Sequence, residues 1–289
     1  MGKIIEAKNV IKEYGSFKNP FQALKGINLD IEEGEFLAIM GPSGSGKTTL
    51  LNLLATIDQA TRGKIYIDGK YIRSYTEKQL SLLRREYISF IFQECNLLDN
   101  LTIRDNITSP LIIMGAEKEE CDKRVESVSK RLGIDTILDK YPSECSGGQK
   151  QRVAACRALI TNPKIIVADE PTGALDTKNS DELLSILRKL NEEDNITIVM
   201  VTHDPYIASF SSRVIMIRDG LLDTTIENKD HNQTRFYNSI LKESARQTIF
   251  KDEESALSID DYEELLNENK RLKKKIIELE YKEYKISRA

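Results

Sequence analysis

Phe36-Leu37-Ala38-Ile39-Met40-Gly41-Pro42-Ser43-Gly44-Ser45-Gly46-Lys47-Thr48 is an apolar run followed by a glycine-rich loop and the start of a helical pattern. This order has the spacing of a phosphate-binding loop behind a buried strand. Glycines let successive backbone N–H groups surround a phosphate, and the helix N-terminus adds positive potential. Lys47 would then reach the β- and γ-phosphates, and Thr48 would offer a hydroxyl to Mg²⁺. The alternative is a purely structural glycine turn.

A second apolar run ends in two adjacent carboxylates, in Ile165-Ile166-Val167-Ala168-Asp169-Glu170. The carboxyl end of a strand is where an open α/β sheet places its ligand. Asp169 is therefore expected to reach the Mg²⁺ shell, and Glu170 is expected to face the γ-phosphate and polarise water. Alone, two neighbouring acids would indicate a solvated turn, but the phosphate-binding loop favours the functional interpretation.

Composition narrows the class of protein. The 289 residues are 40% hydrophobic, so the chain can bury a sizeable core. The 42 basic and 46 acidic residues give a net charge of −4, which disfavours a nucleic-acid partner. No apolar stretch approaches the roughly 20 residues that span a bilayer, and the N-terminus has no apolar signal core. The four cysteines have no Cys-x-x-Cys spacing and are expected to be free thiols in a reducing compartment.

The order of apolar and charged segments predicts an α/β core with an insertion. Between about Cys95 and Asn162 strand patterns are missing and charged helical patterns replace them, so we expect a helical subdomain at about 94–162. The composition changes after about Asn228, and about half of the residues from Lys251 onward are charged. The expected buried parallel strands are Phe36–Met40, Ile88–Phe92, Ile165–Ala168, Ile196–Val201 and Val214–Ile217.

Between the two phosphate motifs lies Cys145-Ser146-Gly147-Gly148-Gln149-Lys150-Gln151-Arg152, at the start of a helical pattern. Ser-Gly-Gly-Gln resembles the signature motif of the ABC ATPase family, which presents a serine hydroxyl, backbone amides and a helix N-terminus to the γ-phosphate held by another subunit. The family usually has leucine where Cys145 stands, which affects local packing and leaves the phosphate contacts intact. The alternative is an ordinary Gly-Gly helix start.

Other family positions can be matched one at a time. Gln93, in Phe92-Gln93-Glu94, resembles the Q-loop glutamine, and Asp176, in Ala174-Leu175-Asp176, resembles the D-loop aspartate, although it reads equally well as a helix N-cap. His203, in Val201-Thr202-His203-Asp204, resembles the switch histidine, whereas His231 has no such context. Tyr14, in Lys12-Glu13-Tyr14-Gly15, resembles the aromatic residue that stacks on adenine, with a structural tyrosine as the alternative.

The resemblance covers about residues 3 to 228 and implies a P-loop NTPase (RecA-like) α/β core, an antiparallel β subdomain, an inserted helical subdomain and a C-terminal helical tail. It implies an ATPase with ATP and Mg²⁺ as cofactors, working as a homodimer. Catalytic roles fall to Glu170, His203 and Gln93, and Mg²⁺ would be held by Thr48, Gln93 and Asp169. The ATP-binding residues would be Tyr14, Gly41, Ser43, Gly44, Gly46, Lys47, Thr48 and Thr49. The partner copy would contribute Ser146, Gly147, Gly148, Gln149 and the loop of Asp176.

Three segments resemble the branch of the family that contains the MacB, LolD and FtsE proteins, and within it the ATPases of bacitracin-type antimicrobial-peptide resistance. These segments are Asn96 to Thr102, Pro171 to Asp176 and Thr234 to Leu241. The resemblance implies a separate membrane permease and a place at the cytoplasmic face of the membrane. Lipoprotein release and control of cell-wall hydrolysis are the alternatives within the branch.

Non-transport ABC ATPases and regulatory proteins are further alternatives. ABC ATPases that act on ribosomes usually hold two cassettes, and those that act on DNA carry long coiled-coil or zinc insertions, whereas this chain has one phosphate loop and one signature. A regulatory or scaffolding protein with vestigial ATPase activity is another alternative, and the intact Glu170 and His203 argue against it.

We expect three segments: an ATPase domain at 1–228, a short helix or linker at 229–250 and a charged helical tail at 251–289. From Tyr262 a heptad pattern places Leu265, Leu272, Leu279 and Ile286 at d positions. A single charged helix, a short dimer clasp and a docking helix for a partner all remain open for this tail.

Overall fold

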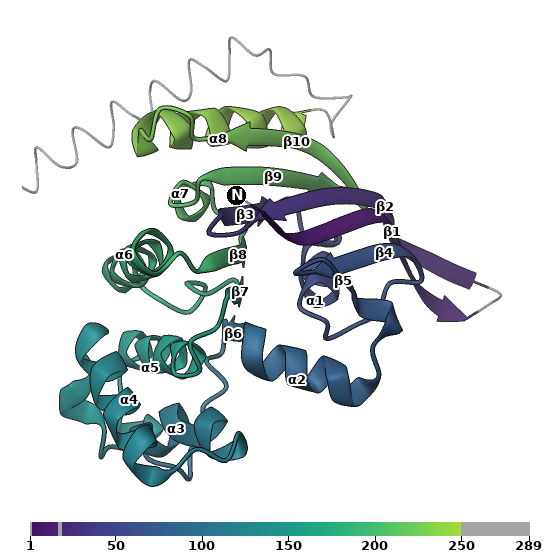
Figure 1. Cartoon of the computed structure of the whole chain (residues 1–289). Helices are drawn as coiled ribbons and strands as arrows, with labels where there is room; N and C mark the ends of the chain where they lie inside the picture. Colours follow the sequence, from purple (N-terminus) through teal and green to yellow (C-terminus); the bar gives the residue numbers. More distant parts are fainter. Residues whose placement is uncertain (1, 17–18, 250–289) are drawn as a thin grey trace, which may run out of the picture. The chain divides into compact units, whose positions relative to one another are not determined.

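The computed structural model describes residues 2–16 and 19–249. The chain divides into two compact units, Met1–Ile240 and Leu241–Ala289, and each is treated by itself. The first unit holds both sheets and all the residues expected to form the site (Figure 1). Helix α8 (Gln233–Ile249) begins in it. The expected tail of residues 251–289, with its heptad pattern, lies outside the described residues.

A six-stranded sheet forms the centre of the first unit, with the strand order β10-β9-β3-β8-β7-β6. Strands β9, β3, β8, β7 and β6 run parallel, and β10 pairs antiparallel with β9. All five residues of β3 and of β8 are buried, as expected for parallel strands covered on both faces. The strands are β3 (Phe36–Met40), β6 (Ile88–Phe92), β7 (Ile165–Asp169), β8 (Thr197–Val201), β9 (Arg213–Arg218) and β10 (Leu221–Glu227).

A second, four-stranded antiparallel sheet has the order β2-β1-β4-β5. Its strands are β1 (Lys3–Ser16), β2 (Asn19–Glu32), β4 (Arg62–Ile67) and β5 (Lys70–Tyr71). Helix α1 (Lys47–Leu54) lies between the two sheets, and its Leu50, Leu51, Leu53 and Leu54 pack in one cluster with residues of both (Figure 1). The antiparallel subdomain implied by the family resemblance is thus present.

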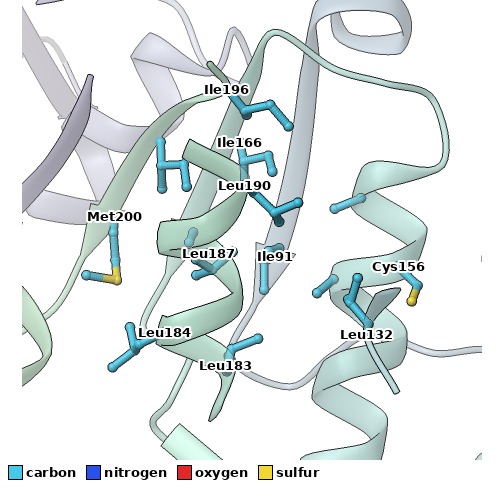
Figure 2. Close-up of a cluster of buried hydrophobic side chains, with 14 of the residues drawn as sticks. Ile91, Leu132, Cys156, Ile166, Leu183, Leu184, Leu187, Leu190, Ile196 and Met200 are labelled. Carbon is cyan, nitrogen blue, oxygen red and sulfur yellow. The ribbon is translucent and has the colours of Figure 1, made fainter. Parts of the chain in front are cut away.

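The opposite face of the six-stranded sheet is covered by helices. Alternating residues of β3 divide between the two faces: Phe36, Ala38 and Met40 join the helical cluster, and Leu37 and Ile39 face α1. Figure 2 shows Leu183, Leu184, Leu187 and Leu190 of α6 (Thr177–Asp194) packed towards this face. The spacing of these leucines is that of one buried helical stripe. The sheet and its flanking clusters therefore hold the strand ends that carry the motifs in fixed positions.

Residues 93–164 contain no strand in the described structure, so the helical insertion is observed where strand patterns were missing. Its helices are α3 (Ile103–Ile113), α4 (Lys118–Arg131) and α5 (Gly147–Leu159), with short 3₁₀ turns at Asp135–Ile137 and Pro142–Glu144. The remaining elements of the first unit are the 3₁₀ turn Ile72–Ser74, α2 (Glu77–Tyr87) and α7 (Pro205–Ala208). No helix of the described residues is long and apolar enough to cross a membrane. The α/β fold class expected from the sequence is confirmed.

Candidate nucleotide site

The glycine-rich loop runs from the end of β3 to the start of α1 and is closely packed from behind. Gly41 has φ 151°, and a Cβ there would lie 2.1 Å from the carbonyl oxygen of Ile217. Gly46 caps α1 with φ 105°, and a Cβ there would lie 2.8 Å from the carbonyl oxygen of Ala23. Larger residues at either position would clash with backbone and strain the turn. The glycines are therefore required by the path of the loop.

Several of the other residues that could contact phosphate lie at the surface of the loop. Ser43 and Gly44 are exposed at the tip of the loop, and Thr48 and Thr49 lie in the first turn of α1. Lys47 Nζ donates hydrogen bonds of 2.9 Å to the carbonyl oxygens of Gly41 and Pro42, so its ammonium lies over the loop. Burial lowers the pKa of Lys47, while the carboxylates of Glu170 and Asp169 act to raise it. The cation is thus held beside two acids at the mouth of the loop.

Asp169 and Glu170 meet this loop because of the sheet register. Ile39 of β3 pairs with Val201 of β8, which pairs with Asp169 at the end of β7. Thr48 Oγ1 lies 3.5 Å from Asp169 Oδ1. Burial raises the pKa of Asp169, and the neighbouring Glu170 raises it further. The ends of adjacent parallel strands therefore gather the two acids, Lys47 and Thr48 into one place.

Glu170 has a positive φ of 46°, a backbone conformation that residues other than glycine adopt only at a cost in free energy. Its N–H donates to the carbonyl oxygen of Val201 at 3.0 Å, and its carbonyl accepts from Gly173 N–H at 3.0 Å. His203, in the loop after β8, places Nδ1 2.8 Å from Glu170 Oε1. The tight turn thus aims the carboxylate of Glu170 at the histidine of the neighbouring strand end.

Gln93 follows β6, the edge strand beside β7. Phe92 pairs with Asp169, so the glutamine emerges next to the two acids. A Cβ on Gly173 would lie 2.7 Å from Gln93 Nε2, so the amide packs directly against the turn that follows Glu170. Gln93, Asp169, Glu170 and His203 are therefore brought together.

The Ser146 motif forms the N-terminus of α5. Ser146 is the N-cap, and its Oγ accepts from Gln149 N–H at 3.3 Å while Gln149 Oε1 accepts from Ser146 N–H at 2.9 Å. The N–H groups of Gly147 and Gly148 then point out of the positive end of the helix dipole. Such a helix N-terminus is a suitable place for an anion. Gly148 is buried against the side chain of Asn179.

Asp176 is the N-cap of α6. Its Oδ1 accepts from Asn179 N–H at 2.8 Å, and its Oδ2 accepts from Asn179 Nδ2 at 2.8 Å. The bond from the Asn179 N–H is the main cause of the lowered pKa of Asp176. A Cβ on Gly148 would lie 2.1 Å from Asn179 Oδ1. Asn179, which sequence reasoning missed, therefore connects the start of α5 to the start of α6.

Tyr14 lies on β1, away from the acids. Its hydroxyl donates to Asp58 Oδ2 at 2.9 Å, and Lys12 Nζ lies 4.8 Å from the ring centroid. Tyr14 pairs with Phe21 on β2, the same strand whose Ala23 backs the loop at Gly46. The exposed ring therefore lies a short way along the sheet from the phosphate loop, at a suitable place for a flat base.

Comparisons with known proteins identify the family of the chain. The model of the ABC transporter family matches residues 24–173. The chain belongs to the ABC transporter family. It is 50% identical over 239 residues to the bacitracin export ATP-binding protein BceA of Halalkalibacterium halodurans, covering 83% of this chain and 94% of the relative. It is also 44% identical over 241 residues to the ABC transporter ATP-binding protein YxdL of Bacillus subtilis, covering 83% and 93%.

A solved relative shows the same fold. This relative is the ATP-binding cassette MJ0796 of Methanocaldococcus jannaschii, solved as a dimer in a post-hydrolysis state bound to ADP and Pi. Its structure matches this chain with a TM-score of 0.72 and 42% sequence identity. The match covers 77% of this chain and 98% of the relative. The chain is thus an ATP-binding, ATP-hydrolysing ABC subunit, as expected from its motifs.

The ABC site also fits a magnesium ion. The Thr48 hydroxyl lies 3.5 Å from the Asp169 carboxylate, and the Gln93 amide packs against the turn that follows Glu170. Oxygen donors of this kind suit Mg²⁺, which is held by few protein ligands together with phosphate oxygens. The donor set therefore matches the group that the sequence implies.

Proposed function

We propose that the chain works as a homodimer in which two ATP molecules are each held between the phosphate loop of one copy and the Ser146 helix of the other. One observation carries this proposal. Among the hydrogen bonds of the described residues, none joins 146–149 to 41–48, whereas Gly147 lies beside Ala174 in the loop before Asp176. An anion-binding helix end that serves no loop in its own chain is suited to a phosphate presented by a partner.

Each site would divide the work of phosphoryl transfer. Lys47 would neutralise the β- and γ-phosphates, and Thr48, Asp169 and Gln93 would orient Mg²⁺. Glu170 would polarise the attacking water, with His203 fixing its carboxylate. The partner's copy of the Ser146 helix would complete the shell around the γ-phosphate, so that ATP closes the dimer and hydrolysis releases it.

We further propose that this motion drives a separate membrane permease. A groove of about 420 Å³ lies between α2, β6, α3 and α5 and borders Phe92, directly before Gln93. Its lining combines Phe90, Phe92 and Ile113 with Arg84 and Arg85, and Ile113 is 69% exposed. An apolar floor with a basic rim suits a short amphipathic cytoplasmic segment of a permease. The chain would then act at the cytoplasmic face of the membrane.

The relatives support a separately encoded permease and a peptide substrate. Macrolide export ATP-binding/permease proteins named MacB also match, but the aligned part is only 37% of the one from Mannheimia succiniciproducens, whereas 94% of the H. halodurans export protein is covered. By its 50% identity to that bacitracin export protein, we propose that the transporter confers resistance to bacitracin-type peptides.

The first test is Glu170→Gln. The variant should bind ATP as the wild type does, lose at least about 100-fold in hydrolysis, and elute as a dimer in ATP. Glu193→Gln, which alters an exposed carboxylate paired with Arg131, is the matched control and should behave as the wild type. Retained turnover, or a monomer in saturating ATP, would contradict the assignment.

The peptide proposal needs its own test. The chain is expressed together with the membrane protein that co-purifies with it, in a bacitracin-sensitive host. Wild type should raise the inhibitory concentration of bacitracin, and Glu170→Gln should not. Equal sensitivity with both, despite ATPase activity of the wild-type complex, would exclude this substrate class and leave the ATPase proposal intact.

A further inference from the structure

The loop after β6, residues Gln93 to Asn96, is held in an unusual backbone conformation. Cys95 and Asn96 have successive positive φ values of 58° and 45°. Residues with side chains rarely adopt the left-handed region, and two in sequence persist only when their surroundings impose it. Neither residue is a glycine, so the cause must lie in the contacts of the loop.

Arg157 of α5 supplies one of these contacts. Its Nη2 donates to the carbonyl oxygen of Cys95 at 2.6 Å, and its Nη1 donates to that of Asn96 at 2.6 Å. The planar guanidinium is a rigid fork, so it fixes the separation and direction of both carbonyls at once. A lysine ammonium could replace the charge but not this geometry.

Gln151 of α5 supplies the second contact, from a side chain that is 1% exposed. Its Nε2 donates to the carbonyl oxygen of Phe92 at 3.1 Å, and its Oε1 accepts from Cys95 Sγ at 2.5 Å. These bonds fall on either side of Gln93 along the chain. The segment that carries Gln93 is therefore anchored before and after it, and both anchors come from one helix.

The side chain of Gln93 is in close contact with the turn that follows Glu170. Its amide packs against Gly173, whose N–H is bonded to the carbonyl of Glu170. There is no room for even a methyl group between them, since a Cβ on Gly173 would lie 2.7 Å from Gln93 Nε2. A displacement of the loop would therefore alter the position of Gln93 relative to Glu170.

We infer that Arg157 and Gln151 are positioning residues that join the two nucleotide sites of the dimer through α5. The helix presents Ser146 at its N-terminus to the ATP of the partner, and it holds the loop of Gln93 at the ATP of its own chain. A shift of α5 caused by closure on one ATP is passed to the glutamine at the other. This inference rests on the proposed division of each site between two copies.

The first experiment measures steady-state ATP hydrolysis by Arg157→Lys. We expect kcat to fall at least about 10-fold and the KM for ATP to change less than about 3-fold, because the phosphate loop is untouched. Gln151→Ala should behave in the same way. Arg124→Lys is the matched control, since Arg124 also donates to a carbonyl at the end of α5, that of Ile160, but does not contact the loop. A midpoint of thermal unfolding within about 2 °C of wild type would exclude general destabilisation.

The second experiment measures ATP hydrolysis at one nucleotide site at a time. It uses mixed dimers, purified by two different tags on the two chains. Glu170→Gln silences the site of the chain that carries it. When Arg157→Lys is on that same chain, the remaining activity belongs to the partner's ATP, which is completed by the Ser146 helix of the Arg157→Lys chain. When Arg157→Lys is on the other chain, the activity belongs to its own ATP. We expect both mixed dimers to lose at least about 10-fold relative to a mixed dimer carrying Glu170→Gln alone.

Full activity in the first mixed dimer with loss in the second would overturn the inference, because Arg157 would then serve only its own chain. Wild-type kcat in Arg157→Lys would overturn it as well. If Glu170→Gln does not form dimers in ATP, the proposed function itself fails, and size-exclusion chromatography of that variant alone shows this independently.

Discussion

His203 Nδ1 lies 2.8 Å from Glu170 Oε1, although the two residues come from different strand ends. His203 follows β8 and has a side chain that is 75% exposed, while that of Glu170 is 22% exposed. The histidine therefore covers the carboxylate from the open side, where the γ-phosphate of a bound ATP would lie. The contact orients Glu170 through Nδ1, so Nε2 is the ring nitrogen that would bind the phosphate.

Removing this contact should reduce hydrolysis and spare binding. His203→Ala is expected to lower kcat by about 10²-fold or more, as loss of an oriented acid–base partner does, with ATP affinity nearly unchanged. The chain has only two histidines, so His231→Ala is a natural control. Hydrolysis and equilibrium ATP binding are measured for both. Equal activities would show that His203 does not act in the reaction.

The ring of Tyr14 is expected to stack on the adenine base and so to strengthen the binding of ATP. Tyr14→Ala should weaken ATP binding by about 3- to 10-fold, the range for loss of one aromatic contact. Tyr14→Phe removes only the hydroxyl bond to Asp58 and should bind ATP nearly as the wild type does. Titration calorimetry with ATP and with inorganic triphosphate separates the base from the phosphates. A loss of triphosphate binding in Tyr14→Ala would refute the stacking role.

Gly147→Ala and Gly148→Ala, in adjacent positions of the Ser146 motif, should change the stability of the chain by different amounts. At Gly148 the new Cβ would meet Asn179 Oδ1 at 2.1 Å, which forces Asn179 off Asp176 and should cost about 1–3 kcal/mol of stability. At Gly147 the nearest atoms would lie at 3.8 and 3.9 Å, so the single chain should be unaffected or slightly stabilised. Denaturant unfolding without nucleotide measures both. Gly148→Ala combined with Asn179→Ala should recover part of the loss.

Asp169 should make the stability of the nucleotide-free chain depend on pH. Burial and Glu170 raise its pKa above the ordinary value of 3.8, so the folded chain holds this proton more tightly than the unfolded chain does. The contribution of Asp169 to stability is then full below pH 3.8 and falls as pH rises through the raised pKa. Asp169→Asn should therefore unfold at a temperature a few degrees higher than wild type at pH 8, with no advantage near pH 4. Mg·ATP should reverse the order at pH 8. An advantage independent of pH would show that the pKa of Asp169 is not raised in the folded chain.

Much of the architecture could be predicted because it follows from local pattern. The continuous apolar runs before Gly41 and before Asp169 predicted strands buried on both faces, and those strands are observed as β3 and β7. By contrast, no pattern marked β1 and β2. Each is 14 residues long, and their pairing shifts register at several points, so period-two alternation is broken. That subdomain was expected only from the family resemblance.

In the candidate site too, some residues could be predicted from local sequence and others could not. Lys47, Asp169, Glu170 and His203 could be predicted because each lies in a recognisable motif at a strand end. Asn179 and Arg157 could not, since their roles depend on contacts between segments distant in sequence, such as the 2.6 Å bond from Arg157 to the carbonyl of Asn96. Nothing in the local sequence of α5 distinguishes Arg157 from an exposed helical arginine. Tertiary packing alone gives it a function.

The division of each site between two copies is tested most directly by mixing two inactive variants. Glu170→Gln disables the site of its own chain, and Ser146→Arg disables the helix that serves the partner. In a mixed dimer, one site then combines wild-type Glu170 of one chain with wild-type Ser146 of the other. We expect each variant alone to be inactive and an equal mixture to hydrolyse ATP at about a quarter of the wild-type rate, because about half of the dimers are mixed and each has one intact site. If the mixture stays inactive while the two chains co-elute as a dimer with ATP, the proposal that each site is divided between two copies is wrong.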